Sequence, residues 1–384
     1  MTGQRGRYAI AGLGLTEQGR GLGRTSRELR AQALALALDD AGLERSAVDG
    51  YIHCWVERED LRFLGLAPNF SLQLQSGGAT PGIAIMTAMG MIEAGQAECV
   101  AINYGFAPSE GYLRGQPFGD IGSLGYGYPS LYGLIGAAAA HALHARRHFD
   151  LYGTTSEHLG AVAVQQRAYA VNRPGTLGYG KPLTLDDHQA SPLVADPLRR
   201  YDCTRDTDGG ACLLVMSAER AKQCRSRPVY VLGAGTGHNI ARWFDKTIYA
   251  HHDNIGPAKA RAFEMARVGL DDIDCAQFYD AFTIGTLMQL EHYGFCKDGQ
   301  GGPFVAEGGM GPDGAIPTNT GGGQLSAYYT AGFTPIVEAM LQLRGEAGAG
   351  QLDGMNIALV SGHGLNGGVQ NTWAHATLIL GNAA

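Results

Sequence analysis

Two stretches of the 384-residue chain decide its fold: residues 31–53, AQALALALDDAGLERSAVDGYIH, and residues 258–280, AKARAFEMARVGLDDIDCAQFYD. They align at an offset of 227 residues, and each contains a helical pattern, a Gly-Leu step, an acidic turn and a strand. Glycine is favoured directly after the last helical turn, so Gly42 and Gly269 are predicted to end the two helices. The match indicates a structural unit that occurs twice in the chain.

A second pair of helices follows these stretches. Thr80-Pro81 opens GIAIMTAMGMIEAGQ, and Thr334-Pro335 opens IVEAMLQLRGEAG. Threonine is a good N-cap and proline is favoured in the first turn, so both dipeptides predict a helix start. The first of these helices is apolar nearly all round, which predicts burial on every side. Strands are predicted after the two helices at 99–104 and 356–361, and at the start of each repeat at 8–13 and 229–233.

These repeats predict an N-terminal half, residues 1–226, and a C-terminal half, residues 227–384. The segment from about 106 to 200 has no counterpart in the second half, and it contains helical patterns at about 131–149 and 155–171. It is predicted to be an inserted loop domain. Two similar halves of mixed helices and strands around buried helices predict an α/β protein with an α/β/α/β/α layered sandwich.

Composition excludes several functions. The net charge of −7 and the pI near 5.9 argue against nucleic-acid binding, and no apolar run is long enough to span a membrane. Seven scattered cysteines without a CxxC pair indicate reduced thiols in a cytoplasmic protein, with no structural metal. The 58 glycines are about twice the ordinary usage of ~7%. Charged residues make up only 17%, which suggests that part of the surface meets other protein.

Four segments resemble the sterol-carrier-protein type of thiolase, and the resemblance extends over nearly the whole length. CTRDTDGGACLLVMSAERA (203–221) resembles the SDGAAA strand of that family, and FYDAFTIGTLMQLEHYGFCKDGQGG (278–302) resembles its HDCF segment. TNTGGGQLSAYY (318–329) resembles its NPSGG…GHP loop, and LRGEAG (343–348) is nearly a direct match. The resemblance implies the thiolase fold.

The chain departs from the thiolases at their reactive positions. The nucleophilic cysteine is replaced by Gly78, the HDCF histidine by Tyr279 and the GHP histidine by Tyr329, while the last catalytic position falls near Leu365. This pattern resembles the thiolase-fold aldolases that complete steroid side-chain degradation. The resemblance implies a carbon–carbon lyase that cleaves a 17-hydroxy-steroid 20-carboxyl-CoA to a 17-ketosteroid and propionyl-CoA. It also implies a homodimer core with a small zinc-ribbon/OB-fold partner, in some cases linked to a hydratase.

Retro-aldol cleavage needs proton transfers but no covalent acyl carrier, so the loss of the nucleophile is compatible with it. We assign Tyr279 to the β-hydroxyl and Tyr329 to the enolate, although the reverse order stays open, and His363 could join either. A tyrosine that acts as base needs a lowered pKa or a proton relay. Backbone N–H groups of the turns at 77–79 and 364–368 are candidates to stabilise the enolate oxygen. The neighbouring Asp280 has a structural interpretation, and Tyr328 is the alternative if the register slips by one residue.

Substrate contacts are predicted for a further set of residues: Gly78, Asn319, Gly322, Gly367, Arg146 and Arg167. The two arginines lie in the insert, where thiolases hold the CoA nucleotide, so they are candidates for phosphate contact. Each of these residues also has an ordinary structural interpretation, a turn for Asn319 and a solvated surface for the arginines. No cofactor is expected beyond the CoA of the substrate. The helical run His141, His144 and His148 is not expected to bind a metal, because Arg146 and Arg147 would repel a cation.

Two other functions stay open at this point. The chain could be a thiolase or acyltransferase that uses another cysteine, and alkylation by iodoacetamide would then abolish its activity. It could also be a non-catalytic, thiolase-like scaffold subunit. Replacement of both histidines by the same functional residue type favours an enzyme.

Overall fold

The computed structural model describes residues 4–54, 61–110, 136–238, 254–365 and 373–384. The first half comprises β1 (Tyr8–Leu15), α1 (Ser26–Ala41), β2 (Gly50–Cys54), α2 (Leu61–Leu64), β3 (Phe70–Leu74), α3 (Thr80–Glu93), β4 (Cys99–Phe106), β7 (Gly209–Ser217) and α8 (Ala218–Ala221). Between β4 and β7 lie α5 (Gly136–Tyr152), α6 (Ser156–Ala170), α7 (Leu185–Ala190), β5 (Leu193–Ala195) and β6 (Leu198–Arg199).

The second half comprises β8 (Val229–His238), α9 (Ile255–Ala266), β9 (Cys275–Gln277), α10 (Thr283–Tyr293), α11 (Gly301–Ala306), α12 (Gly323–Ser326), α13 (Phe333–Arg344), β10 (Ile357–Leu365) and β11 (Trp373–Gly381). Single 3-10 turns occupy Arg45–Ala47, Pro108–Glu110, Arg200–Asp202, Leu270–Asp272 and Gly348–Gly350.

The strands form a nine-stranded sheet in the order β3-β2-β4-β7-β1-β8-β11-β10-β9. Outward from the short antiparallel contact between β1 and β8, both halves repeat one pattern: an antiparallel pair, a second antiparallel pair and then a parallel pair. The predicted internal repeat is therefore visible in the strand order. The division at residues 226 and 227 stays a prediction.

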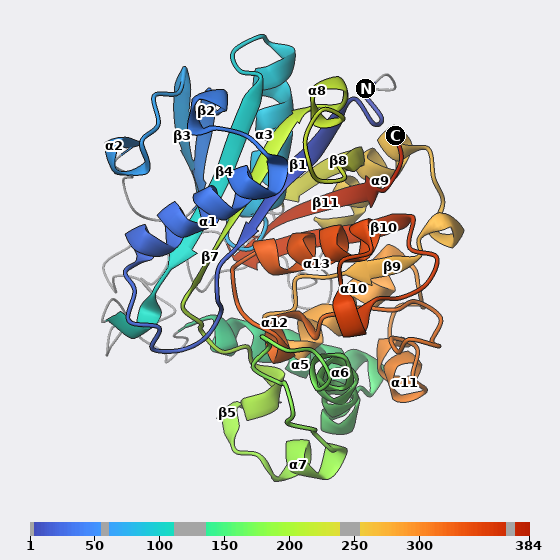
Figure 1. Ribbon diagram of the computed structural model, residues 1–384. Coiled ribbons are helices and arrows are strands. Elements are labelled where there is room, and N and C mark those ends of the chain that lie inside the picture. The colour runs from blue at the N-terminus through green and yellow to red at the C-terminus, as the bar shows by residue number, and fades with distance from the viewer. Residues whose placement is uncertain (1–3, 55–60, 111–135, 239–253, 366–372) are drawn as a thin grey trace.

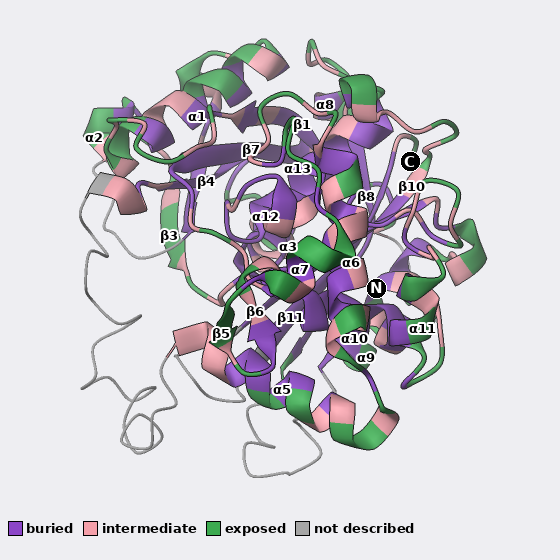
Figure 2. Cartoon of the chain, turned by 90° about the horizontal axis from the view of Figure 1, so that it is seen from below, coloured by how far each residue is buried: buried purple, intermediate pink, exposed green. Residues whose placement is uncertain are grey.

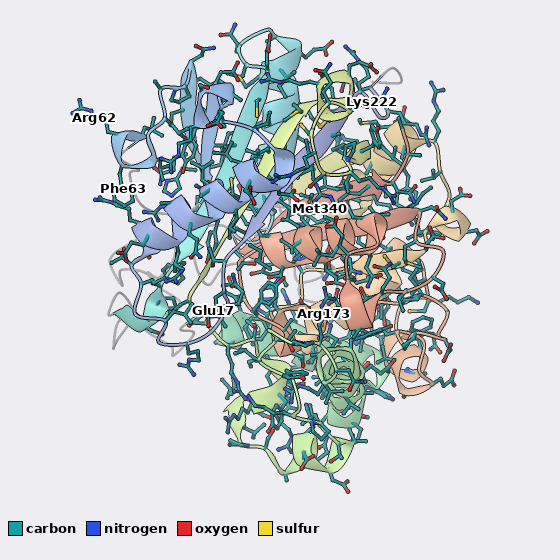
Figure 3. All side chains as sticks on the ribbon, viewed as in Figure 1. Glu17, Arg62, Phe63, Arg173, Lys222 and Met340 are labelled. Atoms are coloured by element: carbon teal, nitrogen blue, oxygen red, sulfur yellow. The ribbon has the colours of Figure 1, made fainter. Side chains whose placement is uncertain are left out.

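Helices cover both faces of each half of the sheet. Alternate residues of β7 point to opposite sides: Cys212 and Leu214 pack with α1, whereas Leu213 and Val215 pack with α3. The central helices α3 and α13 lie between the two halves, and α9 covers the outer side of the second half, as the layered sandwich requires. Met340 of α13, labelled in Figure 3, is buried in this middle layer.

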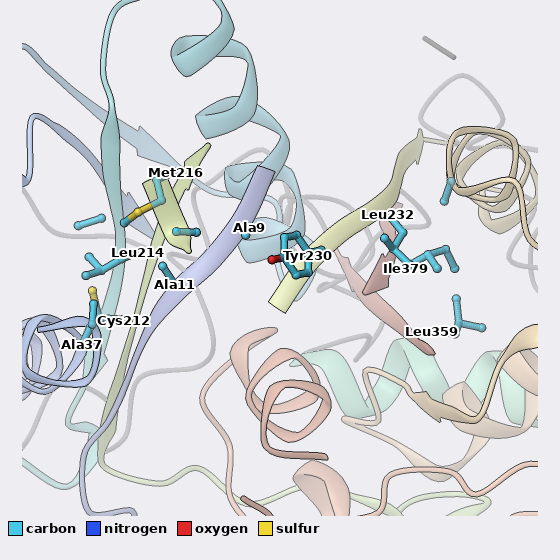
Figure 4. Packing of buried hydrophobic residues seen from close by; sticks show 14 of the residues in the cluster. Ala9, Ala11, Ala37, Cys212, Leu214, Met216, Tyr230, Leu232, Leu359 and Ile379 are labelled. Atoms are coloured by element: carbon cyan, nitrogen blue, oxygen red, sulfur yellow. The ribbon is translucent and has the colours of Figure 1, made fainter. Parts of the chain in front are cut away.

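Figure 2 shows the buried strands running through the interior, while the outer helix α1 exposes one face. Figure 4 shows part of the outer apolar cluster, which draws residues from both halves around Tyr230. Apart from the exposed edge strand β3, the strands are buried on both faces of the sheet. They therefore have nearly continuous apolar sequences rather than alternating polar and apolar residues.

The high glycine count has a physical cause in this packing. A β-carbon on Gly14 of β1 would lie less than 3.0 Å from the Ala33 carbonyl of α1. The same holds for Gly233 of β8 against the Ala262 carbonyl of α9. Glycine thus lets each outer helix approach its strand backbone directly, and the second half repeats the arrangement of the first.

The insert lies below the layered body in Figure 1 and packs on the second half, where α6 contacts α10, α11 and α12. Two buried histidines of the insert contact acidic side chains outside it. His148 of α5 lies 3.1 Å from Glu291 of α10, and His188 of α7 lies 2.9 Å from Asp202. The insert therefore forms one wall of the region next to α12.

Three local predictions are wrong. Gly42 ends α1 with a positive φ of 70°, as predicted, but α9 ends at Ala266, and Arg267 rather than Gly269 takes the left-handed conformation. Helix α3 is not buried on every side, because Ile83, Met86 and Met91 are part-exposed. The strand expected around Tyr279 stops at Gln277, so Tyr279 lies just beyond β9.

Candidate active site

Two tyrosines from separate loops of the second half meet at the start of α3. Tyr279 follows β9, and Tyr329 lies between α12 and α13. Their phenol oxygens are 3.2 Å apart, within hydrogen-bond distance but longer than the usual O–H···O bond. Tyr279 is only 9% exposed and Tyr329 is half-buried. The two tyrosines singled out in the sequence therefore form one site.

Gly78 lies directly against the ring of Tyr279. A β-carbon at position 78 would come within 3.0 Å of two ring carbons of Tyr279 and of the His363 carbonyl oxygen. No side chain fits there without movement of the ring or the backbone. The aromatic ring of Tyr279 thus occupies the space that a residue with a side chain would need at position 78.

Three more glycines close around Gly78. A β-carbon on Gly332 or Gly362 would contact the Gly78 carbonyl, and one on Gly364 would contact the Gly78 nitrogen, each at less than 3.0 Å. Position 78 is therefore enclosed by main chain from α13 and β10 as well as by Tyr279. The close approach of these backbones depends on glycine at all four positions.

The turns that enter α3 and α13 are built alike. The Thr80 hydroxyl accepts a hydrogen bond from Ser76 N at 2.7 Å, and the Thr334 hydroxyl accepts one from Thr330 N at 3.2 Å. Both threonines lie inside their helices, whose N-caps are Ala79 and Gly332, so the prediction that they are N-caps is wrong. Their hydroxyls instead close the preceding turn.

The predicted oxyanion donors of the first turn are partly engaged. The Ala79 N–H donates to the Ser76 carbonyl at 3.2 Å, which removes one of the three N–H groups of residues 77–79. Most of the second candidate turn, including the predicted substrate contact Gly367, lies outside the described residues. Backbone stabilisation of an enolate by either turn stays a prediction.

Both phenols are neutral at ordinary pH. Burial raises the pKa of Tyr279 well above its usual value, and the adjacent Tyr329 raises it further. Burial raises the pKa of Tyr329 to about 12, although the hydrogen bond from Tyr279 opposes this rise. A tyrosine that acts as base needs either a lowered pKa or a proton relay. Because neither pKa is lowered here, only the proton relay remains.

Two further groups near the pair were missed in the sequence. Tyr104, buried in the last part of β4, lies close enough to raise the pKa of Tyr279 electrostatically. Asp206 has a pKa raised by burial, and its charge in turn raises the pKa of Tyr329. In the sequence, the only indication of a role for Tyr104 is its position as the last residue of the predicted strand at 99–104.

Asp280 supports the loop that carries Tyr329. The carboxylate accepts hydrogen bonds from Gln324 N at 2.8 Å and Leu325 N at 3.2 Å, at the start of α12. Burial nevertheless raises its pKa from 3.8 to about 7, because the two N–H groups offset only part of the cost of removing the charge from water. Its structural interpretation agrees with this geometry.

Asn319 and Gly322 shape the same loop. Asn319 adopts a positive φ of 53°, and its side-chain oxygen accepts a hydrogen bond from Phe278 N at 2.6 Å. Gly322 has a φ of 99° and faces Ala170 of α6. Both residues connect the Tyr329 loop to its surroundings, and their contact with substrate stays a prediction.

His363 faces away from Gly78. Its main-chain carbonyl borders Gly78, but its ring is paired through Nδ1 with Nδ1 of His375 on β11 at 2.9 Å. His375 in turn contacts the Tyr293 hydroxyl at 2.7 Å. Burial lowers the pKa of His363 well below its usual value, and the neighbouring His375 lowers it further, so the ring is neutral. The His363 ring is therefore part of a buried series of hydrogen bonds, from His363 through His375 to Tyr293, on the side of β10 away from Gly78.

Tyr328, the alternative to Tyr329, points into a different environment. It lines a pocket with Arg173 and Glu338, which are paired at 2.6 Å. The register that places Tyr329 rather than Tyr328 next to Tyr279 is therefore the one that the structure shows.

The two predicted phosphate-binding arginines differ. Arg146 is exposed and ion-paired with Asp196. Arg167 is half-buried and donates to the Ser326 hydroxyl at 3.0 Å, three residues before Tyr329.

The described part of the chain holds no cluster of three or more acidic, histidine or cysteine side chains arranged for a metal ion. Within the same residues, no helix has the length and apolarity that crossing a bilayer requires.

Similarity to known proteins identifies the family of the chain. A family described as "Thiolase C-terminal domain-like" matches residues 237–382. The chain is 34% identical to a "17-hydroxy-3-oxo-4-pregnene-20-carboxyl-CoA lyase" of Mycobacterium tuberculosis, with 88% of this chain and 92% of that protein covered. It is 33% identical to a "Steroid side-chain-cleaving aldolase" of Thermomonospora curvata, with 94% and 96% covered. The chain belongs to the steroid side-chain-cleaving aldolases of the thiolase fold.

A solved aldolase of this family, the "Ltp2-ChsH2(DUF35) aldolase", superposes with a TM-score of 0.88 at 31% identity and covers 98% of both chains. The thiolase fold and the carbon–carbon lyase class predicted from the sequence are thereby confirmed. The assignment of individual site residues in this aldolase rests on the geometry above.

Replacing Gly78 with alanine should destabilise the aldolase, because the new methyl group overlaps the Tyr279 ring and the His363 carbonyl. We expect a loss of about 1–3 kcal/mol in the free energy of unfolding, measured by chemical denaturation, together with loss of activity. Gly90 is the control, since it lies within α3, the helix that follows Gly78, with nothing within 4 Å of its β-carbon position. Gly90→Ala should stabilise the protein by about 0.5–1 kcal/mol. Equal stability of the two variants would contradict the steric account.

Replacing Asp280 with asparagine should alter how stability depends on pH. The folded state holds the Asp280 proton more tightly than the unfolded state, because the folded pKa of about 7 exceeds the ordinary 3.8. This contribution is fully present below about pH 4 and is lost as the pH rises through about 7. The Tm of the wild type minus that of Asp280→Asn should therefore fall across this window. Parallel Tm curves would show that Asp280 does not titrate there.

Proposed function

We propose that the chain catalyses retro-aldol cleavage of a 17-hydroxy-steroid 20-carboxyl-CoA to a 17-ketosteroid and propionyl-CoA. The observation that supports this most directly is the pair of neutral phenols 3.2 Å apart, in a site where Gly78 replaces a nucleophile. The names of the M. tuberculosis and T. curvata relatives support the same substrate class. A smaller branched β-hydroxyacyl-CoA is the alternative substrate.

The two phenols can carry the required proton without any change in net charge. In our scheme the substrate hydroxyl gives its proton to Tyr329 while Tyr329 passes its own proton to Tyr279. The Cα–Cβ bond breaks, the hydroxyl carbon becomes the ketone, and Tyr279 protonates the α-carbon of the thioester enolate. Tyr329 is placed at the accepting end because it is the more exposed of the two, which reverses the order assigned from the sequence; the relay balances equally in the other direction.

The alternative of a thiolase or acyltransferase is not favoured by the cysteines. All seven are described, and burial raises the pKa of every one of their thiols. The thiolate is the nucleophilic form, so none of these thiols is activated. The scaffold alternative predicts instead that the tyrosine hydroxyls are dispensable.

A basic and aromatic cluster beside the site supports binding of the CoA phosphates. The ring of Tyr201 lies 5.9 Å from the Arg167 guanidinium and 6.0 Å from that of Arg200. Burial lowers the pKa of Arg167, Tyr201 opposes this shift, and the nearby Arg205 lowers the pKa by a smaller amount. A phosphate would relieve the repulsion among these cations. Arg146 is the weaker candidate because Asp196 already neutralises it.

We further propose that the chain acts in an assembly. The solved neighbour includes a DUF35 protein in its name, which supports a small partner of the zinc-ribbon/OB-fold type, and a linked hydratase is part of the same hypothesis. A homodimer core would cover the edge strand β3, where Leu72 is exposed, and the part-exposed apolar residues of α3. We expect a cytoplasmic enzyme that needs no cofactor and binds no nucleic acid.

The test is cleavage of the 17-hydroxy-steroid 20-carboxyl-CoA by the full chain, alone and with a co-purified DUF35-type partner. Wild type should release propionyl-CoA and the 17-ketosteroid, measured by chromatography. Tyr279→Phe and Tyr329→Phe should each lower kcat by at least about 100-fold, because each removes one member of the proton relay. Tyr328→Phe is the matched control and should keep its activity, since Tyr328 lies in the separate Arg173–Glu338 pocket.

Three other results would each redirect the proposal. Wild-type product formation that both substitutions leave unchanged would keep the reaction but remove the tyrosine pair from it. Product loss in the control alone would place the site at Tyr328. Absence of product from the assembled complex would favour a different acyl-CoA or the scaffold subunit.

A further inference from the structure

The main chain of Tyr279 is bound by two side chains in place of a sheet neighbour. The β9 ladder ends at Gln277, so Tyr279 has no strand partner. Its N–H donates to the Ser361 hydroxyl at 3.1 Å, and its carbonyl accepts from Nε2 of Gln289 at 2.9 Å. The Ser361 hydroxyl also donates to Oε1 of Gln289, which closes a ring of hydrogen bonds. Both side chains are fully buried.

The main chain of Tyr329 is held in the same manner by one side chain. The Thr207 hydroxyl accepts from Tyr329 N at 3.0 Å and donates to the Tyr329 carbonyl at 2.9 Å. Thr207 is 1% exposed and lies in the loop before β7, far from Tyr329 in the sequence. Each tyrosine of the pair therefore has both its own backbone N–H and its own carbonyl satisfied by hydroxyl or amide side chains.

We infer that Thr207, Ser361 and Gln289 are positioning residues that fix the separation of the two phenols during the reaction. Their hydrogen bonds to the two tyrosines are all to backbone groups, so they act through Tyr279 and Tyr329, and the inference rests on the proposed function. The phenol separation of 3.2 Å is already at the long end of a hydrogen bond. A backbone shift of a few tenths of an ångström would interrupt a proton relay at this point.

Burial alone does not explain this arrangement. The inner end of a buried loop needs its polar groups satisfied, and ordered water or main chain could serve that purpose. Here three side chains from β10, α10 and the loop before β7 converge on two residues only. A purely structural role predicts loss of stability without a selective loss of turnover, which an experiment can separate.

The central variant is Thr207→Val, which keeps the shape of the side chain and removes its hydroxyl. In the full chain, with its partner if one is required, kcat should fall about 10–100-fold while KM stays nearly constant. Thr207→Ser restores the hydroxyl and should recover most of the turnover. The matched control is Thr16→Val, because the Thr16 hydroxyl also accepts from a backbone N–H, that of Gly210, and donates to a backbone carbonyl, that of Glu17. Its Tm should fall but its kcat should not.

Gln289→Leu provides an independent test at the other tyrosine, with the same expected loss of kcat. The Gln289 amide makes three hydrogen bonds, to the Tyr279 and Gly285 carbonyls and to the Ser361 hydroxyl. Its control is Gln351→Leu, since the Gln351 amide also makes three hydrogen bonds, to backbone groups of Leu352, Gln342 and Ala347. A crystal structure of Thr207→Val gives a readout independent of activity. The phenol oxygens should move beyond hydrogen-bond distance.

The outcomes separate this inference from the proposed function. If Tyr329→Phe abolishes cleavage but Thr207→Val and Gln289→Leu turn over like wild type, the inference is overturned and the function stands. If each variant and its control lose kcat equally, in line with their loss of Tm, the role is structural and the inference is also overturned. If wild type does not cleave the substrate, the crystal structure still decides: an unchanged phenol pair in Thr207→Val overturns the positioning role.

Discussion

The contact between Gly78 and the ring of Tyr279 is the constraint on which the site depends. Position 78 is enclosed by the aromatic ring, by the His363 carbonyl and by the main chain at Gly332, Gly362 and Gly364. A side chain at this point and a tyrosine at position 279 exclude each other. In the proposed mechanism, the Tyr279 ring occupies the volume that a nucleophilic side chain at position 78 would need, so the reaction proceeds without a covalent intermediate at that point.

The duplicated architecture produces this arrangement. The turns before α3 and α13 share the same threonine-closed geometry, and they meet where the Gly78 carbonyl faces Gly332. The second half supplies both tyrosines, and the first half supplies Gly78 and Thr207. Because the pieces come from both repeats, the geometry of the pair is fixed by the packing of the whole molecule. Burial raises the pKa of both phenols and keeps them protonated. This suits a relay that moves one proton without a build-up of charge.

Much of the fold could be read from the sequence, because the repeat at 31–53 and 258–280 carries helix, turn and strand in the same order. The pairing of Tyr279 with Tyr329 was also accessible, but only through the resemblance to a family. The error at Gly269 is a local one: Arg267 takes a left-handed conformation at a cost that propensity does not anticipate. The repeat at 258–280 predicts a strand that includes Tyr279, whereas the ladder between β9 and β10 ends at the pair of Gln277 and Val360.

Other features of the site have no signal in one sequence. Thr207, Gln289 and Ser361 are common residue types whose roles follow from tertiary contacts with two particular backbones. The side chain of His363 lies on the face of β10 opposite Gly362 and Gly364, and its ring is committed to His375. The period of the strand turns its ring away from Gly78, although His363 is adjacent to both glycines in the sequence.

The most direct test of the account is the intact mass of the protein during turnover. The full chain, with its partner if required, would be mixed with excess 17-hydroxy-steroid 20-carboxyl-CoA, quenched in acid at successive times and analysed by mass spectrometry. The account predicts that the mass of the unmodified chain persists while propionyl-CoA and the 17-ketosteroid accumulate. An acyl adduct that forms and decays with turnover, and that maps to a cysteine, would contradict it.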